Sequence, residues 1–133
     1  MPNENSKILV EISPAELIDK ICILELKSKE ITDPEKNRNI THELGILKDV
    51  FEAHIARSKE LDDLIHTLKT ITRRGWDHEE VKRACERAND FGPRFIEAAR
   101  GAYTNNDERS ALWKRINVLL KSNIVQEKSH ENL

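Results

Sequence analysis

The apolar residues of this chain recur with the period of an α-helix, and the clearest run lies between Ile12 and Ile31. Ser13 is a suitable N-cap residue and Pro14 suits the first helical position, so a helix is expected to begin here. A helix this apolar must pack against neighbours on more than one side. Its apolar stripe comprises Leu17, Ile21 and Leu24, with Ile18 and Cys22 beside it. We therefore predict that this stretch forms the central helix.

A second apolar series continues at steps of three and four residues, with polar residues in its middle. It comprises Ile40, Leu44, Leu47, Phe51, His54, Ser58, Leu61, Ile65 and Leu68. This spacing is typical of a heptad seam. One helix from Pro34 to Arg74 would be about 60 Å long, which exceeds a single-domain core. A break or strong bend near His54–Ser58 is therefore favoured over one continuous helix.

Glycine and polar residues divide the second half of the chain. Gly75 either interrupts a helix that restarts at Asp77 or lies inside a continuous helix at a cost of about 1 kcal/mol relative to alanine. Pro93 is expected to open another helix, and the polar run Thr104–Glu108 is expected to end it in a turn. A last amphipathic helix follows, with a predicted end at Ser122–Asn123.

Both ends of the chain carry short segments with the composition of β-strands. Lys7–Ile12 precedes the central helix, and Ile124–Lys128 follows the last one. A lone strand cannot satisfy its backbone hydrogen bonds, so the two are expected to pair within the subunit or, failing that, across a dimer. The predicted fold class is all-α, a bundle of four to six helices with a small pair of terminal strands. It forms a single helical domain over residues 1–133, with flexible ends at 1–6 and 129–133.

The composition limits the partners and the location. The 22 Lys and Arg residues nearly balance 24 Asp and Glu residues, and the net charge of -2 attracts neither nucleic acid nor an anionic membrane. No apolar run approaches the ~20 residues of a membrane span, and no signal-peptide core is found. The two cysteines lack the spacing of a zinc site or a disulfide framework, so they are expected to be reduced. We predict a cytoplasmic protein with no nucleic-acid and no membrane partner.

Several motifs taken together resemble a bacterial family of unknown function whose members have about this length. The opening motif is Ser13–Ile21 with Ile23–Lys27, the middle motif is Asp90–Ile96, and the ending runs from Arg115–Asn117 to Glu127–Ser129. These motifs occur in the order and spacing of the family, whereas Gly75–Glu80 departs from an aliphatic-rich segment of the family. The resemblance implies a single compact helical domain and brings no activity with it.

Two pairs of carboxylates form a candidate metal site. Glu16 and Asp19 lie one turn apart on the central helix, and Glu79 and Glu80 lie on a later one. Such pairs on facing helices could hold Mg²⁺, as in helical nucleotide pyrophosphohydrolases. Glu16 is better explained as a capping residue, and Glu79 and Glu80 as first-turn acids. A metal-dependent nucleotide hydrolase is therefore an alternative function, and Mg²⁺ is expected as a cofactor only under that alternative.

Glu25 and Arg94 are charged residues whose positions require partners. Glu25 lies among apolar residues of the central helix and would need a cation if it is buried. Arg94 lies in the first turn of a helix, where a cation opposes the helix dipole. A structural ion pair or solvated side chains would explain both. The competing hypothesis is a small anionic ligand held by Arg83, Arg87 and Arg94, with Glu25 among the candidate ligand-binding residues.

The preferred function is a non-enzymatic, self-associating interaction or scaffolding module. No catalytic nucleophile motif or phosphate-binding glycine loop is found, so no catalytic residue and no cofactor is assigned. The heptad seam carries more apolar surface than one partner helix covers, which predicts a homodimer and leaves any further protein partner open. The predicted interface comprises Ile40, Leu44, Leu47, Phe51 and His54.

Overall fold

The computed structural model describes residues 6–129, which contain four helices and confirm the all-α prediction. The helices are α1 (Pro14–Glu30), α2 (Pro34–His54), α3 (Lys59–Arg87) and α4 (Pro93–Leu119). The predicted flexible ends, residues 1–6 and 129–133, fall almost entirely outside the described residues. Within the described residues, no helix combines the length and the apolar character needed to cross a membrane.

Side-chain caps explain where three of the helices begin. The Ser13 hydroxyl accepts a hydrogen bond from the Glu16 N–H at 3.2 Å, which confirms the predicted start of α1. Asp33 caps α2 in the same way at 2.9 Å, and Ser58 caps α3 at 3.1 Å. Proline occupies the first turn of α1, α2 and α4, where a backbone N–H would have no partner within the helix. Each of these helix starts therefore has a local chemical cause.

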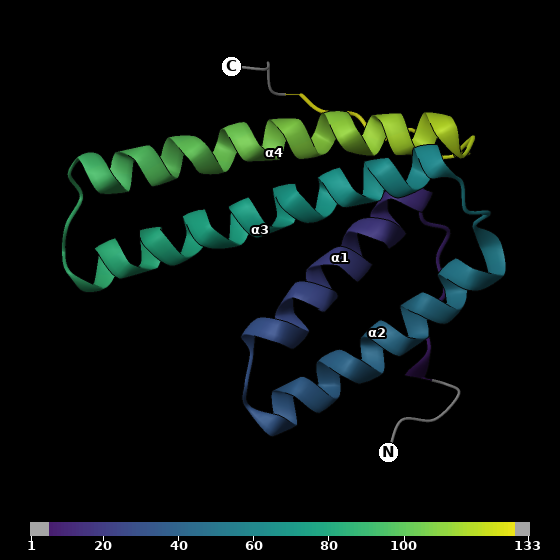
Figure 1. Cartoon of the computed structure of the whole chain (residues 1–133), viewed down its shortest axis with the longest axis horizontal. Coiled ribbons are helices and arrows are strands. Elements are labelled where there is room, and N and C mark those ends of the chain that lie inside the picture. The colour runs from purple at the N-terminus through teal and green to yellow at the C-terminus, as the bar shows by residue number, and fades with distance from the viewer. Residues whose placement is uncertain (1–5, 130–133) are drawn as a thin grey trace.

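The helices form two antiparallel hairpins that diverge from a shared end (Figure 1). α3 and α4 lie side by side along their length, whereas α2 packs against α1 alone. α1 contacts all three other helices, which confirms that it is the central element. The core lies where the hairpins meet, and its fully buried side chains include Ile18, Leu61, Leu68 and Ile116.

The heptad series breaks between α2 and α3, as the sequence favours. α2 ends at His54, and α3 begins at Lys59 after the extended N-cap residue Ser58. Because the chain turns here, Phe51 from one half of the series and Leu61 from the other both enter the core, at 7% and 0% exposure. The turn therefore lets the two halves of the seam share one core.

The predicted turn at Thr104–Glu108 is wrong, because α4 continues through it. Asn105 is 5% exposed, and its side-chain amide donates a hydrogen bond to the Ile71 carbonyl oxygen at 2.9 Å. Gly75 lies opposite, where a Cβ atom would come within 3.0 Å of Asn105 Nδ2, and α3 runs through Gly75 without a break. Gly75 and Asn105, whose sequence contexts suggest that a helix is interrupted, therefore face each other where α3 packs against α4.

A second close approach lies one turn further along the same hairpin. A Cβ atom at Gly101 would lie within 2.9 Å of three ring atoms of His78, so the missing side chain leaves room for the imidazole. His78 is half-buried as a result. Glycines on both helices thus allow α3 and α4 to approach closely at these two points.

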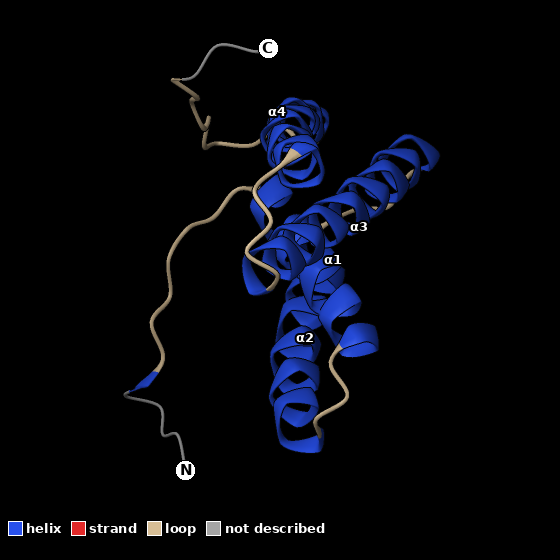
Figure 2. Cartoon of the chain, turned by 90° about the vertical axis from the view of Figure 1, so that its left-hand side faces the viewer, coloured by secondary structure: helices blue, strands red, loops and turns tan. Residues whose placement is uncertain are grey.

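The predicted pair of terminal strands is wrong, because the described residues contain no strand (Figure 2). Residues 7–12, the N-terminal arm, run away from the helices and leave Ile8 87% exposed. Residues 120–128, the C-terminal segment, instead turn back along α4, where Gln126 bonds to Asn117. This bond and others to the helices hold the C-terminal segment along α4, and its contact with the arm is a side-chain hydrogen bond from Asn123 to Glu11, not a strand pairing.

The reversal of the C-terminal segment begins at the end of α4. The helix ends at Leu119, before the predicted end at Ser122–Asn123. Lys121 adopts a left-handed backbone conformation with a φ of 55°, and the Ser122 N–H donates to the Asn117 carbonyl oxygen at 2.8 Å. This is the hydrogen bond of a Schellman motif, which ends the helix and turns the chain back.

We expect Leu68→Ala to lower the free energy of unfolding by about 2–5 kcal/mol, because it leaves a cavity at a fully buried position. Denaturant unfolding followed by circular dichroism measures the change. Val118→Ala, at a residue of α4 that is 71% exposed, is the control. It should change the stability by less than about 0.5 kcal/mol. Equal losses in the two variants would contradict the position of the core.

Candidate functional site

Four polar residues are buried in the described chain, and three of them lie where α1 meets α4. Ser13 and Asp19 belong to the beginning of α1, and Asn117 belongs to the end of α4. The fourth, Asn105, lies in the α3–α4 contact. A buried polar group is costly unless it is hydrogen-bonded, so these side chains are expected to bond to one another or to nearby backbone groups. The α1–α4 junction is therefore the candidate site.

The first turn of α1 is capped by two side chains. Ser13 accepts the Glu16 N–H, and Asn117 Oδ1 accepts a hydrogen bond from the Ala15 N–H at 2.9 Å. Gln126 of the C-terminal segment completes the network, since its Oε1 accepts from Ser13 at 3.0 Å and from Asn117 Nδ2 at 3.2 Å. The N–H groups at the start of a helix have no partner within the helix, so these acceptors stabilise it. Three distant segments of the chain are joined at this point.

A buried ion pair lies one turn further along α1. Asp19 is 1% exposed, and its carboxylate accepts two hydrogen bonds from the Arg109 guanidinium, one of them from Nε to Oδ1 at 2.9 Å. The same guanidinium lies 5.1 Å from the centre of the Trp113 ring, in cation–π geometry. The hydrogen bonds to Asp19 raise the pKa of Arg109 above its usual value, so the guanidinium stays charged. A two-point contact of this kind fixes the orientation of α1 against α4.

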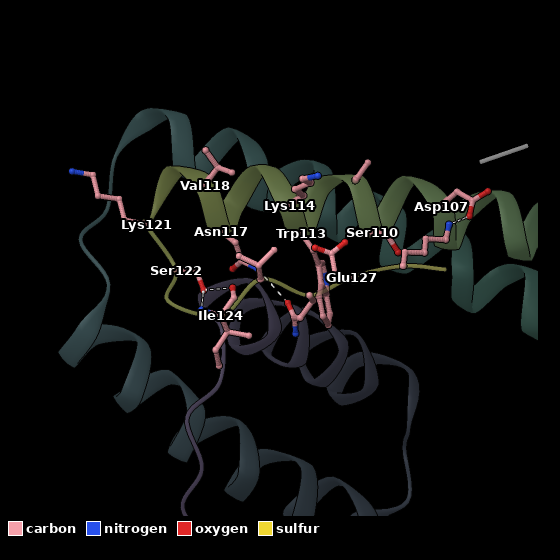
Figure 3. Close-up of a pocket in the computed structure, with 14 residues that line it drawn as sticks. Asp107, Ser110, Trp113, Lys114, Asn117, Val118, Lys121, Ser122, Ile124 and Glu127 are labelled. Carbon is pink, nitrogen blue, oxygen red and sulfur yellow. Dashed lines mark hydrogen bonds and ion pairs between the residues drawn. The ribbon is translucent and has the colours of Figure 1, made fainter. Parts of the chain in front are cut away.

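A groove of about 640 Å³ runs between α4 and the C-terminal segment (Figure 3). Its lining includes Trp113, Lys114, Asn117, Ile124 and Gln126. Lys128 pairs with Asp107 at one end of it. Trp113 Nε1 is buried without a hydrogen-bond partner in the described part of the chain. The central polar side chains of the groove bond to one another and to α1. They therefore connect α1, α4 and the C-terminal segment.

A second groove, of about 670 Å³, lies between α3 and α4. Its charged residues are Arg74, Arg100, Glu97 and Glu108, and of these Arg74 pairs with Glu108 at 3.0 Å. The Asn105 Oδ1 atom is buried beside the groove without a hydrogen-bond partner among residues 6–129. The positive and negative side chains are equal in number, so this groove offers no net charge to attract an anion.

The four carboxylates of the hypothetical metal site are not brought together. Glu16 and Asp19 lie in the first two turns of α1, and Asp19 is already bonded in the buried ion pair. The opposite end of α1 pairs with α3 at Arg73, and Glu79 and Glu80 lie more than one turn further along α3. No three His, Cys, Asp or Glu residues in the described chain form a group that could hold a metal ion.

Glu25 is separated from the three arginines of the hypothetical anion site. It lies between Lys48 of α2 and Lys69 of α3, at 3.6 Å and 3.2 Å, and so forms a structural ion pair with lysines. The three arginines are exposed near the turn between α3 and α4: Arg83, Arg87 and Arg94. Glu25 therefore contributes to packing of α1 against α2 and α3, not to a site at that turn.

The predicted interface residues of α2 face mainly α1. Phe51 belongs to the core, and Leu44 and Leu47 are half-buried against it. Ile40 is also half-buried, whereas His54 is exposed and its Nδ1 lies 3.0 Å from a carbonyl oxygen of the preceding turn. The role of these residues in contacts between copies therefore stays a prediction.

Both cysteines are free and buried. Burial, and after it the neighbouring Glu25 carboxylate, raise the pKa of the Cys22 thiol to about 12. A thiol with so high a pKa is neutral at physiological pH and is not a nucleophile. Cys22 is therefore a packing residue of α1.

The structure is that of an all-helical protein in which two diverging hairpins are joined by a buried polar junction. The chain belongs to the family of unknown function DUF6165, whose family model matches residues 8–132. No curated protein and no solved structure matches the chain. The expectation of a family of unknown function is thus confirmed.

The partners that α4 supplies to the junction were not predicted from the sequence. Arg109, Trp113 and Asn117 recur at intervals of four residues, so they occupy one face of a helix. The neighbouring Ile116 is fully buried, which marks this face as the inner one. Polar residues that repeat along an inner face, together with Asp19 inside the apolar stripe of α1, are the signal that could have revealed the junction.

We expect Asp19→Asn to lower the free energy of unfolding by about 2–4 kcal/mol, because Arg109 would keep a partly buried charge without its partner. Asp77→Asn is the control, since it removes an exposed partner of Arg73 and should cost less than about 0.5 kcal/mol. Urea unfolding measures both. A loss in Asp19→Asn no larger than in the control would show that the buried pair does not hold α1 in place.

We expect Cys22 to resist a disulfide-exchange reagent at pH 8 in the folded protein and to react once the protein is unfolded. The folded pKa of about 12 lies above the ordinary value of 9.0, so the stabilisation from burying the neutral thiol is complete below pH 9 and decreases as the pH rises toward 12. Labelling of a Cys85→Ala variant isolates Cys22. Rapid labelling of the folded variant would contradict its burial.

Proposed function

We propose that this protein is a non-enzymatic interaction module that self-associates as a homodimer. The observation that carries the proposal is its open shape, in which the hairpins diverge and α2 is covered by α1 alone (Figure 1). The proposal places the protein in the bacterial cytoplasm, where free cysteines such as Cys22 and Cys85 persist. It requires no cofactor, membrane or nucleic acid.

The exposed surface is large for a chain of this mass, which supports the proposal. The accessible area is 9730 Å² for 15.4 kDa. A monomeric globular protein of this mass exposes about 7,200 Å², so roughly 2,500 Å² is in excess. Exposed apolar side chains such as Ile8, Leu9 and Val10 contribute to it. A standard interface covers about 800 Å² on each partner, which is less than this excess.

The uncovered side of α2 carries an apolar edge. Ile46 and Val50 lie one turn apart, and they are 51% and 39% exposed. Leu47 and His54, both predicted as interface residues, border this edge at helical spacing. An apolar edge on a helix with a single neighbour is a surface that a second copy can cover.

The alternative functions receive less support from the positions of their residues. The acids of the hydrolase hypothesis lie apart, and the arginines of the ligand hypothesis are exposed at a hairpin turn. We expect no thermal shift with Mg²⁺, with a panel of nucleotides or with inorganic phosphate. A ligand at a hundred times its dissociation constant would stabilise the protein by about 2.7 kcal/mol, so binding would be visible. A reproducible shift with Mg²⁺ and a nucleotide would favour the hydrolase instead.

We expect size-exclusion chromatography with light scattering to give about twice 15.4 kDa at tens of micromolar protein. Ile46→Glu should raise the dissociation constant by about tenfold or more, because it places a charge in an apolar contact. Thr41→Glu is the control, since Thr41 lies about 140° around α2 from Ile46.

Two results would contradict the proposed function. The first is a monodisperse species of 15.4 kDa at every concentration tested. The second is an equal effect of Ile46→Glu and Thr41→Glu, since a contact through the α2 edge distinguishes the two sides of the helix.

A further inference from the structure

The N-terminal arm carries the most exposed apolar side chains of the described residues. Ile8, Leu9 and Val10 are 87%, 89% and 73% exposed. Side chains alternate along an extended segment, so both faces of the arm are apolar. The backbone of residues 8–11 makes no hydrogen bond within residues 6–129. Residues 8–10 thus present apolar side chains and backbone groups that the other described residues, 6–129, do not cover.

The base of the arm is fixed. Ile12 packs against the core, and Ser13 is 1% exposed and bonded to Gln126 at 3.0 Å. The Glu11 carboxylate accepts a hydrogen bond from Asn123 at 2.8 Å. The arm therefore leaves the core in a set direction and stands away from the helices (Figure 2). A segment fixed at its base and extended beyond it is suited to reach a second molecule.

We propose that the arms of two copies pair as an antiparallel ribbon across the two-fold axis of the homodimer, an inference that rests on the proposed self-association. The arm reads Lys7-Ile8-Leu9-Val10-Glu11 and is complementary to itself in one antiparallel register. With Leu9 opposite Leu9 of the second copy, Lys7 lies opposite Glu11 and Ile8 lies opposite Val10. Opposite charges then meet at both ends and apolar side chains meet between them, which stabilises a strand pair.

The charge pattern favours a second copy over any other occupant. A two-fold contact uses the same surface twice, so it requires a segment that is complementary to itself. The C-terminal segment of the same copy reaches the arm at Glu11 through Asn123 but leaves Ile8, Leu9 and Val10 exposed, because Gln126 and Lys128 hold it along α4. A two-stranded ribbon is marginal on its own in water, so the arms act together with the apolar edge of α2.

Leu9→Cys tests the pairing, because it places two cysteines directly opposite each other. Opposite residues of an antiparallel pair have Cα atoms about 4.5–5.5 Å apart, which suits a disulfide. We expect this variant to form a disulfide-linked dimer under mild oxidation about tenfold faster, or more, than Val118→Cys, a control on α4 that is 71% exposed. The native cysteines are buried and add no background.

Ile8→Cys tests the register. Alone it should cross-link slowly, because Ile8 lies opposite Val10 of the second copy and not opposite itself. A mixture of Ile8→Cys and Val10→Cys proteins should cross-link as fast as Leu9→Cys. Equal rates for Leu9→Cys and Val118→Cys would overturn the arm pairing. If light scattering shows a dimer in that case, the arm inference fails and the proposed function stands, whereas a monomer at every concentration removes both.

Reversal of the end charges gives an independent test. Lys7→Glu should weaken the dimer roughly fivefold, because it places like charges opposite each other at both ends of the ribbon. Lys7→Glu combined with Glu11→Lys should restore the affinity, as measured by sedimentation equilibrium. Lys20→Glu, at an exposed position of α1, is the control and should leave the affinity unchanged. A double variant weaker than Lys7→Glu alone would overturn the proposed register.

Discussion

The buried contact between α1 and α4 is the constraint on which the rest of the structure depends. The Asp19 carboxylate is removed from water, so it requires a cation, and Arg109 supplies one through two hydrogen bonds. Ser13 and Asn117 accept the first N–H groups of α1 in the same region. Loss of any one partner would leave a polar group unpaired in the interior. These bonds therefore determine where α1 begins and which end of α4 it meets.

The shape of the molecule follows from this fixed point. Because α1 meets α4 near its end, the α1–α2 hairpin accompanies the α3–α4 hairpin over part of its length and then diverges (Figure 1). α2 keeps an uncovered apolar edge, and the N-terminal arm leaves the junction toward solvent. The side chains of the junction bond to one another and so connect α1, α4 and the C-terminal segment. The proposed self-association would use the surfaces that this arrangement leaves uncovered.

The sequence reveals structural features that depend on neighbouring residues, but it does not reveal those that depend on contacts between residues far apart in the chain. The start of α1 was predictable from Ser13, since a cap and its helix are neighbours in the chain. Gly75 and Asn105 look like interruptions in isolation, and only their contact across α3 and α4 explains why both helices continue. Asp19 suggested a metal ligand because its partner Arg109 lies far along the sequence. Both terminal segments have β-like composition, but the C-terminal one is held along α4 by Gln126 and Lys128, and the N-terminal arm extends away from the helices.

A double-mutant cycle between Asp19 and Arg109 tests the central claim most directly. The free energies of unfolding of Asp19→Asn, Arg109→Met and the double variant give the coupling between the two side chains, separate from the cost of each substitution. If the pair holds α1 against α4, the coupling should be about 1.5–3 kcal/mol, and the double variant should be no less stable than Asp19→Asn alone. A coupling below about 0.5 kcal/mol would contradict the account, because the two substitutions would then act as independent surface changes.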